Sequence, residues 1–311
     1  MRLPVLIGIM AVLLFVTPSF AVDRSVDDPQ KAKITTQNLS IMDRLPDSTW
    51  KVNFVLVMNY AAMCQMMNFN SEADMLSVYP NTLSLDFPRF KNKAYIIKDA
   101  GNGIQTIVFR GSGNIRNAVT DLDFLPKYSE KLKCKVHRGF LKSCLELDPI
   151  LRPHLDKNRP IRLTGSSLGA GLAAMYGLFL QLDGYDVDAV ITFGQPRILN
   201  EEGRQLYRES PLYRIVNRTD AVTAIPPHRP FGYVHFGTGI VLVDEETFSL
   251  YNESKGERVL ENAIVANFWN KLRKKDISIK NHFINVYYDK MANYIEHGVQ
   301  YKKYNWILPE D

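Results

Sequence analysis

The sequence predicts an α/β protein with a mostly parallel central sheet that is covered by helices on both faces. Short apolar runs typical of buried strands alternate with segments that have the composition of helices, which favours this architecture. One strand leads directly into a glycine-rich turn and an alanine-rich helix, over 162–182. No linker or change in composition divides the chain of 311 residues, and we therefore expect one domain after a short N-terminal leader.

The individual elements can be assigned in chain order. Residues 22–46 are polar and should form a loose arm or a segment that wraps around the domain. Residues 52–67 should form a helix that is apolar on most sides and therefore buried. The turn 99–103 should join two strands, at 94–98 and 105–110. The later elements are a strand at 162–164, a helix from about 170 to 182, and strands at 189–193 and 213–216.

The composition is that of an ordinary globular protein, with 46% hydrophobic and 23% charged residues, and it excludes a disordered chain, a coiled coil and a collagen. The net charge of +5 is small for this length, whereas a nucleic-acid-binding protein should gather its basic residues in a patch. We interpret the densest basic run, 271–275, as the solvated end of a helix. We therefore expect no nucleic-acid partner, and the sequence indicates no stable protein partner.

The first 21 residues have the pattern of a secretory signal peptide. A short positive start and an almost wholly apolar stretch over 3–16 precede Ser19-Phe20-Ala21, which fits the small-x-small cleavage pattern. The alternative is a membrane anchor, but the apolar run is shorter than the roughly 20 residues that span a bilayer. Cleavage after Ala21 predicts a single mature domain over 22–311 that is secreted or remains in the secretory pathway.

Three cysteines are few, and an oxidising compartment would allow one disulfide with one thiol left over. Cys134 and Cys144 are the nearer pair in sequence, and the sequence leaves open whether they are bridged. Cys64 lies in the apolar helix and is interpreted as a small buried hydrophobe. No spacing of cysteines and histidines indicates zinc, so we expect no metal site.

The segment Gly165-Ser166-Ser167-Leu168-Gly169 has the pattern G-x-S-x-G between an expected strand and an expected helix, which is the context of a nucleophile elbow. In an elbow the central residue, here Ser167, takes up a strained backbone conformation, and the glycines let the strand and the helix pass closely. The serine hydroxyl is then exposed above the sheet. The alternative is a glycine-rich turn whose serine only caps the helix.

A serine is a weak nucleophile until a base removes its proton, and this base needs an orienting carboxylate. In this architecture the chain order is serine, acid, histidine. Asp220 is the leading acid because it closely follows the strand at 213–216, and the alternative is a turn aspartate. The backbone N–H of Leu168 is the expected oxyanion donor, since it comes directly after the nucleophile. Four histidines follow the elbow and leave the base open at this stage: His228, His235, His282 and His297.

Six blocks of sequence follow one another in an order and spacing that are hard to obtain by chance. They are 108–112 (Val-Phe-Arg-Gly-Ser), 114–117 with 121–122, 136–140 (Val-His-Arg-Gly-Phe), 167–170, 192–197 (Thr-Phe-Gly-Gln-Pro-Arg) and 217–227. These blocks resemble blocks of the fungal-type class 3 lipases, a branch of the α/β-hydrolases. In the same order, they correspond to the oxyanion loop, the lid helix, the block after the lid, the elbow, the next strand end and the acid loop of that family. The resemblance runs from about Tyr60 to Tyr288.

The resemblance implies an α/β-hydrolase fold, with a central mostly parallel sheet flanked by helices and a short helical lid. It favours His282 as the base, because 281–283, followed by Tyr287, matches the block that carries the catalytic histidine in the family. His235 is the alternative, although it matches a block whose histidine is structural. The resemblance also implies that Ser112 is the second oxyanion donor; the alternative for this residue is a turn serine.

The expected lid has one apolar stripe at helical spacing, formed by Ile115, Ala118, Val119 and Leu122. A short amphipathic helix of this kind can cover a pocket in water and turn its stripe towards lipid. The alternative is an ordinary surface helix packed on the core. Because Ala118 stands where some relatives carry a large aromatic residue, we expect weak interfacial activation.

The chain departs from the family pattern near the expected site. Ser166 stands in place of the usual His or Tyr before the nucleophile, and Thr238 stands where many relatives have Glu. These two differences leave substrate preference open and remove no catalytic group. The paired cysteines that link the termini of many secreted relatives are also missing.

The resulting hypothesis is a secreted serine ester hydrolase that cleaves acylglycerols through a Ser167–Asp220–His282 triad and an acyl-enzyme intermediate. It would use no metal or organic cofactor and would act at a lipid–water interface. The alternatives are an esterase for short-chain or aryl esters, or a phospholipase, on the same fold. A third alternative, from a different functional class, is a catalytically silent lipid-binding relative. Fold analogy alone would not separate them.

Overall fold

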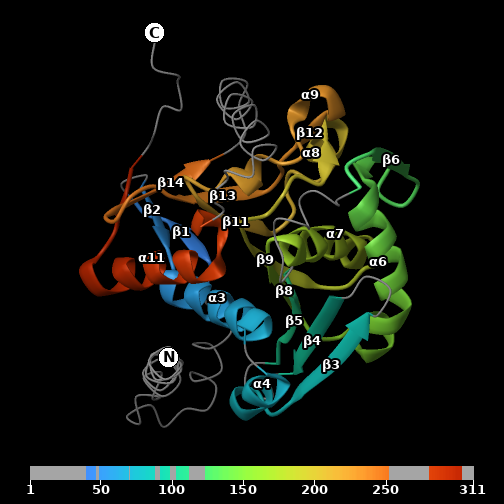
Figure 1. The fold of residues 1–311 in the computed structure, drawn as a ribbon, viewed down its shortest axis with the longest axis horizontal. Coiled ribbons are helices and arrows are strands. Elements are labelled where there is room, and N and C mark those ends of the chain that lie inside the picture. Colours follow the sequence, from blue (N-terminus) through green and yellow to red (C-terminus); the bar gives the residue numbers. More distant parts are fainter. Residues whose placement is uncertain are drawn as a thin grey trace.

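A nine-stranded sheet forms the centre of the described part of the chain, in the computed structural model (Figure 1). The structure describes residues 40–46, 49–69, 71–87, 92–98, 103–111, 123–251 and 280–302. The expected signal peptide, Ser112, the expected lid helix and the basic run 271–275 lie outside these residues. The strand order is β15-β14-β13-β11-β9-β8-β5-β4-β3.

The middle of this sheet is parallel and its margins are mostly antiparallel. The parallel strands are β5 (Gln105–Phe109), β8 (Ile161–Ser166), β9 (Val187–Phe193), β11 (Leu212–Asn217) and β13 (Thr238–Leu242). The marginal strands are β3 (Thr82–Phe87), β4 (Asn92–Lys98), β14 (Thr247–Tyr251) and β15 (Gln300–Tyr301). Their pairings are antiparallel except for that of β14 with β15, which is parallel. The prediction of an α/β fold with a mostly parallel sheet is confirmed.

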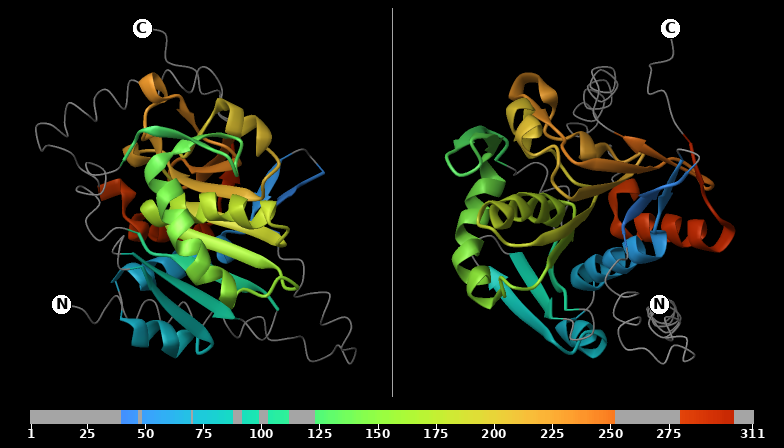
Figure 2. Two further views of the ribbon diagram at one scale, coloured as in Figure 1. Left: turned by 90° about the vertical axis from the view of Figure 1, so that its right-hand side faces the viewer. Right: turned by 180° about the vertical axis from the view of Figure 1, so that it is seen from behind.

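Helices cover both faces of the sheet, as Figures 1 and 2 show. Helices α6 (Arg138–Leu151) and α7 (Leu168–Leu182) lie on one face, and α3 (Phe54–Phe69) and α11 (Ile284–His297) lie side by side on the other. Side chains that alternate along the strands divide the core into two clusters. In β5, for example, Ile107 and Phe109 face α6 and α7, whereas Val108 faces α3.

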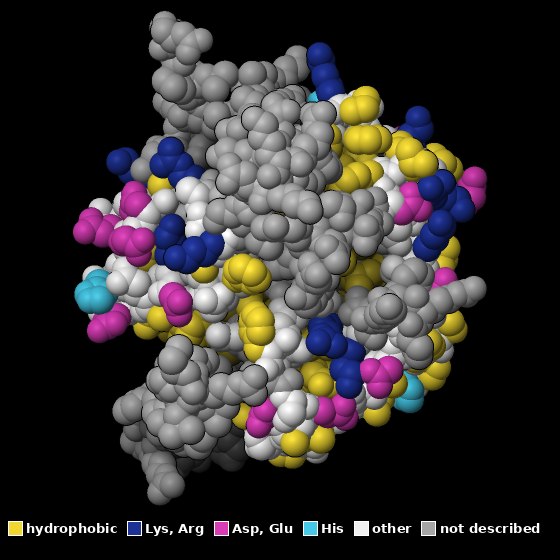
Figure 3. Space-filling model, in the orientation of Figure 1, with side chains coloured by type: hydrophobic (Ala, Val, Ile, Leu, Met, Phe, Trp, Pro, Cys, Tyr) yellow, Lys and Arg dark blue, Asp and Glu magenta, His cyan; other side chains and the backbone are white. Residues whose placement is uncertain are grey.

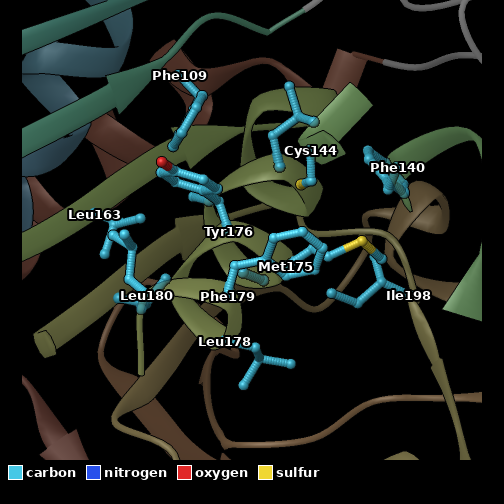
Figure 4. Close-up of a cluster of buried hydrophobic side chains, with 14 of the residues drawn as sticks. Phe109, Phe140, Cys144, Leu163, Met175, Tyr176, Leu178, Phe179, Leu180 and Ile198 are labelled. Atoms are coloured by element: carbon cyan, nitrogen blue, oxygen red, sulfur yellow. The ribbon is translucent and has the colours of Figure 1, made fainter. Parts of the chain in front are cut away.

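The cluster under α6 and α7 is dense in aromatic and long aliphatic side chains (Figure 4). Tyr176 of α7 contacts Phe109 of β5 edge to face, with their ring centroids 6.0 Å apart. Helix α7 is buried on nearly every side because it lies between the sheet and α6. This burial explains why its sequence is rich in leucine, alanine and glycine and has no polar face.

The remaining elements are short. A second sheet, in the order β12-β10-β7-β6, contains β6 (Pro126–Ser129), β7 (Cys134–His137), β10 (Leu199–Asn200) and β12 (Tyr233–Val234). A hairpin pairs β1 (Met42–Arg44) with β2 (Trp50–Val52). The short helices are α4 (Glu72–Val78), η2 (Arg152–His154), α8 (Glu201–Leu206), η3 (Ala221–Ala224), α9 (His228–Phe231) and η4 (Lys280–His282).

The expected strands, and the expected helices at 52–67 and 170–182, are found within two residues of their predicted ends. The described end of the expected arm, 40–46, contains strand β1. Helices α6 and α11 and the second sheet did not emerge from the sequence. All three cysteines are free and buried, so Cys134 and Cys144 are not bridged, and the interpretation of Cys64 as a buried hydrophobe is confirmed.

On the surface, charged side chains of both signs alternate around the described part of the face seen in Figure 3, in keeping with the small net charge. Within the described ranges, we found no helix with the length and apolar character that crossing a membrane requires.

Candidate active site

The turn at Ser167 has the geometry of a nucleophile elbow. Strand β8 ends at Ser166 and helix α7 begins at Leu168, so that Ser167 alone makes the turn between them. Its backbone has φ 57° and ψ −123°, a left-handed conformation that costs on the order of 1–3 kcal/mol in a residue with a side chain. The N–H of Ser167 donates to the carbonyl of Phe193 in the neighbouring strand (2.9 Å), which helps to hold this conformation.

The two glycines of the motif are required by close backbone contacts. A Cβ atom on Gly165 would lie 2.3 Å from the carbonyl oxygen of Gly169, and one on Gly169 would lie 2.3 Å from the carbonyl oxygen of Phe109. Both contacts are with backbone atoms, which cannot move aside as a flexible side chain can. The sequence-based prediction of an elbow, with glycines that let the strand and helix pass closely, agrees with this geometry.

A hydrogen-bond chain links Ser167, His282 and Asp220. The Nε2 atom of His282 lies 2.8 Å from Ser167 Oγ, and Nδ1 of the same ring lies 2.7 Å from Asp220 Oδ2. A carboxylate can only accept, so Nδ1 carries the proton and Nε2 is left to accept the serine proton. All three side chains are buried, with residue exposures of 7% or less.

Asp220 stands directly beyond the loop that follows β11, at the start of η3. Its Oδ1 accepts from the backbone N–H of Val222 (2.9 Å), which fixes the carboxylate plane. Its Oδ2 accepts a second hydrogen bond, from the phenol of Tyr287 (2.6 Å). Burial, followed by the negative charge of Asp220, raises the pKa of Tyr287 well above its ordinary value, so this phenol stays protonated and remains a donor.

Gly194, at the end of β9, makes room for the histidine and the carboxylate. It has a φ of +59°, and a Cβ atom there would lie 2.8 Å from His282 Cε1 and 2.9 Å from Asp220 Oδ2. Sequence reasoning placed this glycine in a family block without giving it a role. The signal that could have identified it is its position directly after a buried strand, next to the strand that leads to Asp220.

Two further polar side chains hold the loops of the site. Asn217 is buried, and its Nδ2 donates to the carbonyl of Asn281 (3.1 Å), which joins the loop of the acid to the residue before His282. Arg197 is fully buried, and its Nη1 donates to the carbonyls of Ala224 (2.8 Å) and Pro226 (3.1 Å), downstream of the acid. Neither contact was apparent from the sequence.

The other candidate histidines lie elsewhere. His235 is buried, with Nε2 2.7 Å from the carbonyl oxygen of Thr223. Burial and the positive charges of Arg214 and Arg197 lower the pKa of His235 well below its ordinary value, so it stays neutral. His228 begins the short helix α9, and His297 is exposed at the end of α11. Of the four histidines that follow the elbow, the structure brings His282 to the serine and the aspartate.

The structure describes one of the two expected oxyanion donors, Leu168. Leu168 is the first residue of α7, where backbone N–H groups have no partner within the helix. Ser112 and the expected lid that follows it lie outside the described residues. Among the described residues, no cluster of three or more His, Cys, Asp or Glu side chains could hold a metal ion.

The open, mostly parallel sheet and the serine elbow at the carboxyl end of one of its strands have the architecture of the α/β-hydrolase fold. Residues 106–229 match the model of the family "Lipase (class 3)". This match agrees with the resemblance found in the sequence.

Individual relatives are also named as lipases. The chain is 34% identical over 151 residues to a lipase of Rhizomucor miehei, a match that covers 44% of this chain and 41% of the relative. It is 29% identical over 151 residues to a secreted mono- and diacylglycerol lipase of Fusarium solani, covering 46% of this chain and 45% of the relative. The match thus spans less than half the length of either relative.

Solved structures with under 25% identity support the fold alone. The triacylglyceride lipase of Rhizomucor miehei has a TM-score of 0.54 at 23% identity, over 61% of this chain and 80% of that one. Lipase II of Rhizopus niveus gives a TM-score of 0.54 at 23% identity, over 60% and 80% of the two chains.

Proposed function

We propose that this chain is a serine ester hydrolase that acts on acylglycerols. The observation that carries the proposal is the hydrogen-bond chain from Ser167 Oγ through His282 to Asp220, on a serine held in a left-handed conformation. Nucleophile, base and orienting acid meet with distances of 2.7–2.8 Å, which is the arrangement that acyl transfer through a serine requires.

In the proposed reaction, Ser167 Oγ attacks the ester carbonyl carbon while His282 Nε2 takes its proton. The tetrahedral intermediate collapses as the imidazolium returns this proton to the leaving alcohol, which leaves an acyl group on the serine. Asp220 holds the ring through Nδ1 and stabilises its charged form. Water, activated by the same histidine, then attacks the acyl-enzyme and releases the fatty acid.

The negative charge that develops on the carbonyl oxygen needs donors in place before the reaction. We assign the backbone N–H of Leu168 to this role, because it follows the nucleophile at the N-terminus of α7. Ser112 is the proposed second donor, on the basis of the sequence. Removing one such donor typically lowers turnover by about a hundred- to a thousandfold.

The substrate class rests on the relatives. Their names describe triacylglyceride lipases and mono- and diacylglycerol lipases, and a water-insoluble glyceride ester at a lipid–water interface is the substrate class they have in common. We further propose that the protein is secreted after cleavage behind Ala21; two relatives are named as secreted lipases. N-terminal sequencing of the exported protein should then begin at Val22.

The decisive experiment measures fatty acid release by the mature chain from a long-chain triacylglycerol emulsion, a diacylglycerol emulsion and a dissolved butyrate ester. We expect strong activity on the emulsions that is lost in Ser167→Ala and in His282→Ala. Activity on the dissolved ester alone would make the protein an esterase with the same triad. Full activity of Ser167→Ala would overturn the mechanism.

A catalytically silent lipid-binding protein is the candidate from another class. The hydrogen-bonded serine, histidine and aspartate argue against it, because a binding protein has no use for a strained, base-linked serine. Labelling with a fluorophosphonate separates the two directly. We expect covalent labelling of the wild-type chain and none of Ser167→Ala; an unlabelled wild-type chain would favour the silent relative.

A further inference from the structure

The last turn of helix α3 joins two strand ends of the active site. The side chain of Asn68 lies between them: its Oδ1 accepts from the N–H of Gly111 (3.0 Å), and its Nδ2 donates to Ser166 Oγ (2.9 Å). Gly111 comes two residues after β5, in the expected oxyanion loop, and Ser166 is the last residue of β8, directly before Ser167. One amide side chain therefore connects the oxyanion loop to the nucleophile elbow.

The two segments that Asn68 connects are in close contact. A Cβ atom on Gly111 would lie 2.9 Å from the carbonyl oxygen of Ser166 and 3.2 Å from its Oγ. Strands β5 and β8 are parallel neighbours, with Phe109 paired to Gly165. Ser166 is only 5% exposed and Gly111 is buried, so these hydrogen bonds are largely shielded from water and its competition.

The bridge needs an amide of this length. It uses one acceptor and one donor of the same side chain, whereas leucine, which has a similar shape, and alanine offer neither group. It also needs a small hydroxyl at Ser166, because a large His or Tyr side chain there would take up the space that the Asn68 amide occupies. The departure from the family at Ser166 and the contact made by Asn68 thus belong together.

We propose that Asn68 is a positioning residue for ester hydrolysis, which holds Gly111, two residues after β5, in register with the nucleophile elbow. The inference rests on the proposed function. The oxyanion donors act on charge that appears only in the transition state. A shift of Gly111 away from the elbow should therefore reduce the stabilisation of the transition state more than it reduces substrate binding. Loss of the bridge should therefore lower kcat and leave KM almost unchanged.

The test compares kcat and KM on a dissolved butyrate ester for the wild type, Asn68→Ala, Asn68→Leu and Ser166→Ala. We expect both Asn68 variants to lose about tenfold in kcat, less than the hundred- to thousandfold typical of losing an oxyanion donor outright, with KM within about twofold. Inactivation by an alkylphosphonate ester, whose phosphoryl oxygen occupies the oxyanion position, should slow by the same factor. The double variant Asn68→Ala/Ser166→Ala should lose no more than the worse single variant, because both changes break one bridge.

Asn53→Ala is the matched control, because it removes the same amide at the other end of α3. Asn53 lies directly before this helix, and its Oδ1 accepts from the N–H of Leu56 (3.0 Å). We expect this variant to melt at a lower temperature with kcat unchanged. The inference is overturned if both Asn68 variants keep kcat within twofold of the wild type, or if Asn53→Ala loses kcat to the same extent. Full activity of Ser167→Ala would instead overturn the proposed function, and this inference with it.

Discussion

The phenol of Tyr287 donates a 2.6 Å hydrogen bond to Asp220 Oδ2, the same oxygen that lies 2.7 Å from His282 Nδ1. With the N–H of Val222 on Oδ1, the buried carboxylate has three donors. A buried carboxylate needs such donors to remain ionised, and an ionised carboxylate is what a charged imidazole ring needs beside it. Tyr287 therefore supports the acid of the proposed triad from helix α11.

The first prediction removes this phenol. Tyr287→Phe should lower the free energy of unfolding by about 1–3 kcal/mol, since a hydrogen bond to a charged buried group is lost. It should also lower kcat severalfold with little change in KM, because the ring of His282 is then held less firmly. Denaturant unfolding and ester kinetics check both. Unchanged stability and unchanged kcat together would show that the phenol does not support the carboxylate.

A second variant tests the acid itself. Asp220→Asn keeps the shape of the side chain but replaces an acceptor oxygen with an NH2 group, which cannot accept the Nδ1 proton. The imidazole should then lose its correct tautomer, and kcat should fall by about 10⁴-fold, as in other enzymes with this triad. A loss smaller than tenfold in a correctly folded variant would assign the role of acid to another residue.

The roles of His235 and His282 can be separated by mutation. His282→Ala should abolish hydrolysis, because no other described side chain lies within hydrogen-bond reach of Ser167 Oγ to act as base. His235→Asn should lower the melting temperature while the folded fraction retains most of its kcat, because His235 contacts the carbonyl of Thr223. The reverse pattern of kinetics and melting would transfer the base to His235.

His137 should make the stability depend on pH. It is fully buried, its Nδ1 caps α6 through the N–H of Phe140, and burial lowers its pKa from 6.5 to about 4. The unfolded chain therefore binds more protons than the folded one between these values. The stabilising contribution of the neutral His137 to the free energy of unfolding is fully present above pH 6.5. It is lost as the pH falls to about 4, by up to about 3 kcal/mol.

The variant His137→Asn can still cap the helix but does not titrate. As the pH is lowered from 7 to 4, the free energy of unfolding of this variant should fall by up to about 3 kcal/mol less than that of the wild type. His154→Asn, at an exposed position in η2, should keep the wild-type pH dependence. Parallel pH curves for the wild type and His137→Asn would refute the assignment.

Two glycines of α7 give a matched pair for the elbow. Gly169→Ala would place a Cβ atom 2.3 Å from the backbone of Phe109 and should lose about 1–3 kcal/mol of stability and most of the activity. Gly177→Ala meets side chains and no backbone, with Val190 Cγ2 at 2.8 Å, and gains about 1 kcal/mol of helix propensity. It should remain active and lose less stability than Gly169→Ala. Equal losses in both would show that the contact at the elbow has no special role.

Local patterns in the sequence were sufficient for the elbow and the strands around it. The buried strands are continuous apolar runs, and the motif around Ser167 fixes its own backbone through two glycines, so both are encoded within a few residues. Asp220 was also within reach, because it comes just after a buried strand. The family resemblance was needed to choose His282 over His235, since both are followed by aromatic residues and neither lies in a distinctive local pattern.

Contacts between distant segments could not be predicted from the sequence. Asn68 and Ser166 are 98 residues apart, and Asn217 and Asn281 are 64 residues apart. In the local sequence, Asn68 and Asn217 cannot be distinguished from surface residues at a helix end or in a turn. Their roles depend on which chain ends meet at the edge of the sheet, and this is decided by packing of the two hydrophobic clusters rather than by local propensity.

The proposed base enters the structure with the C-terminal helix. His282 lies 115 residues beyond Ser167 and two residues before α11. This helix packs on α3 through the rings of Tyr294 and Phe54, with centroids 5.1 Å apart. A nascent or refolding chain can therefore complete β8, the elbow and most of the sheet and still be inert. Recovery of hydrolysis should trail the recovery of helical circular dichroism, and a chain that ends before residue 280 would have the nucleophile but lack the histidine that activates it.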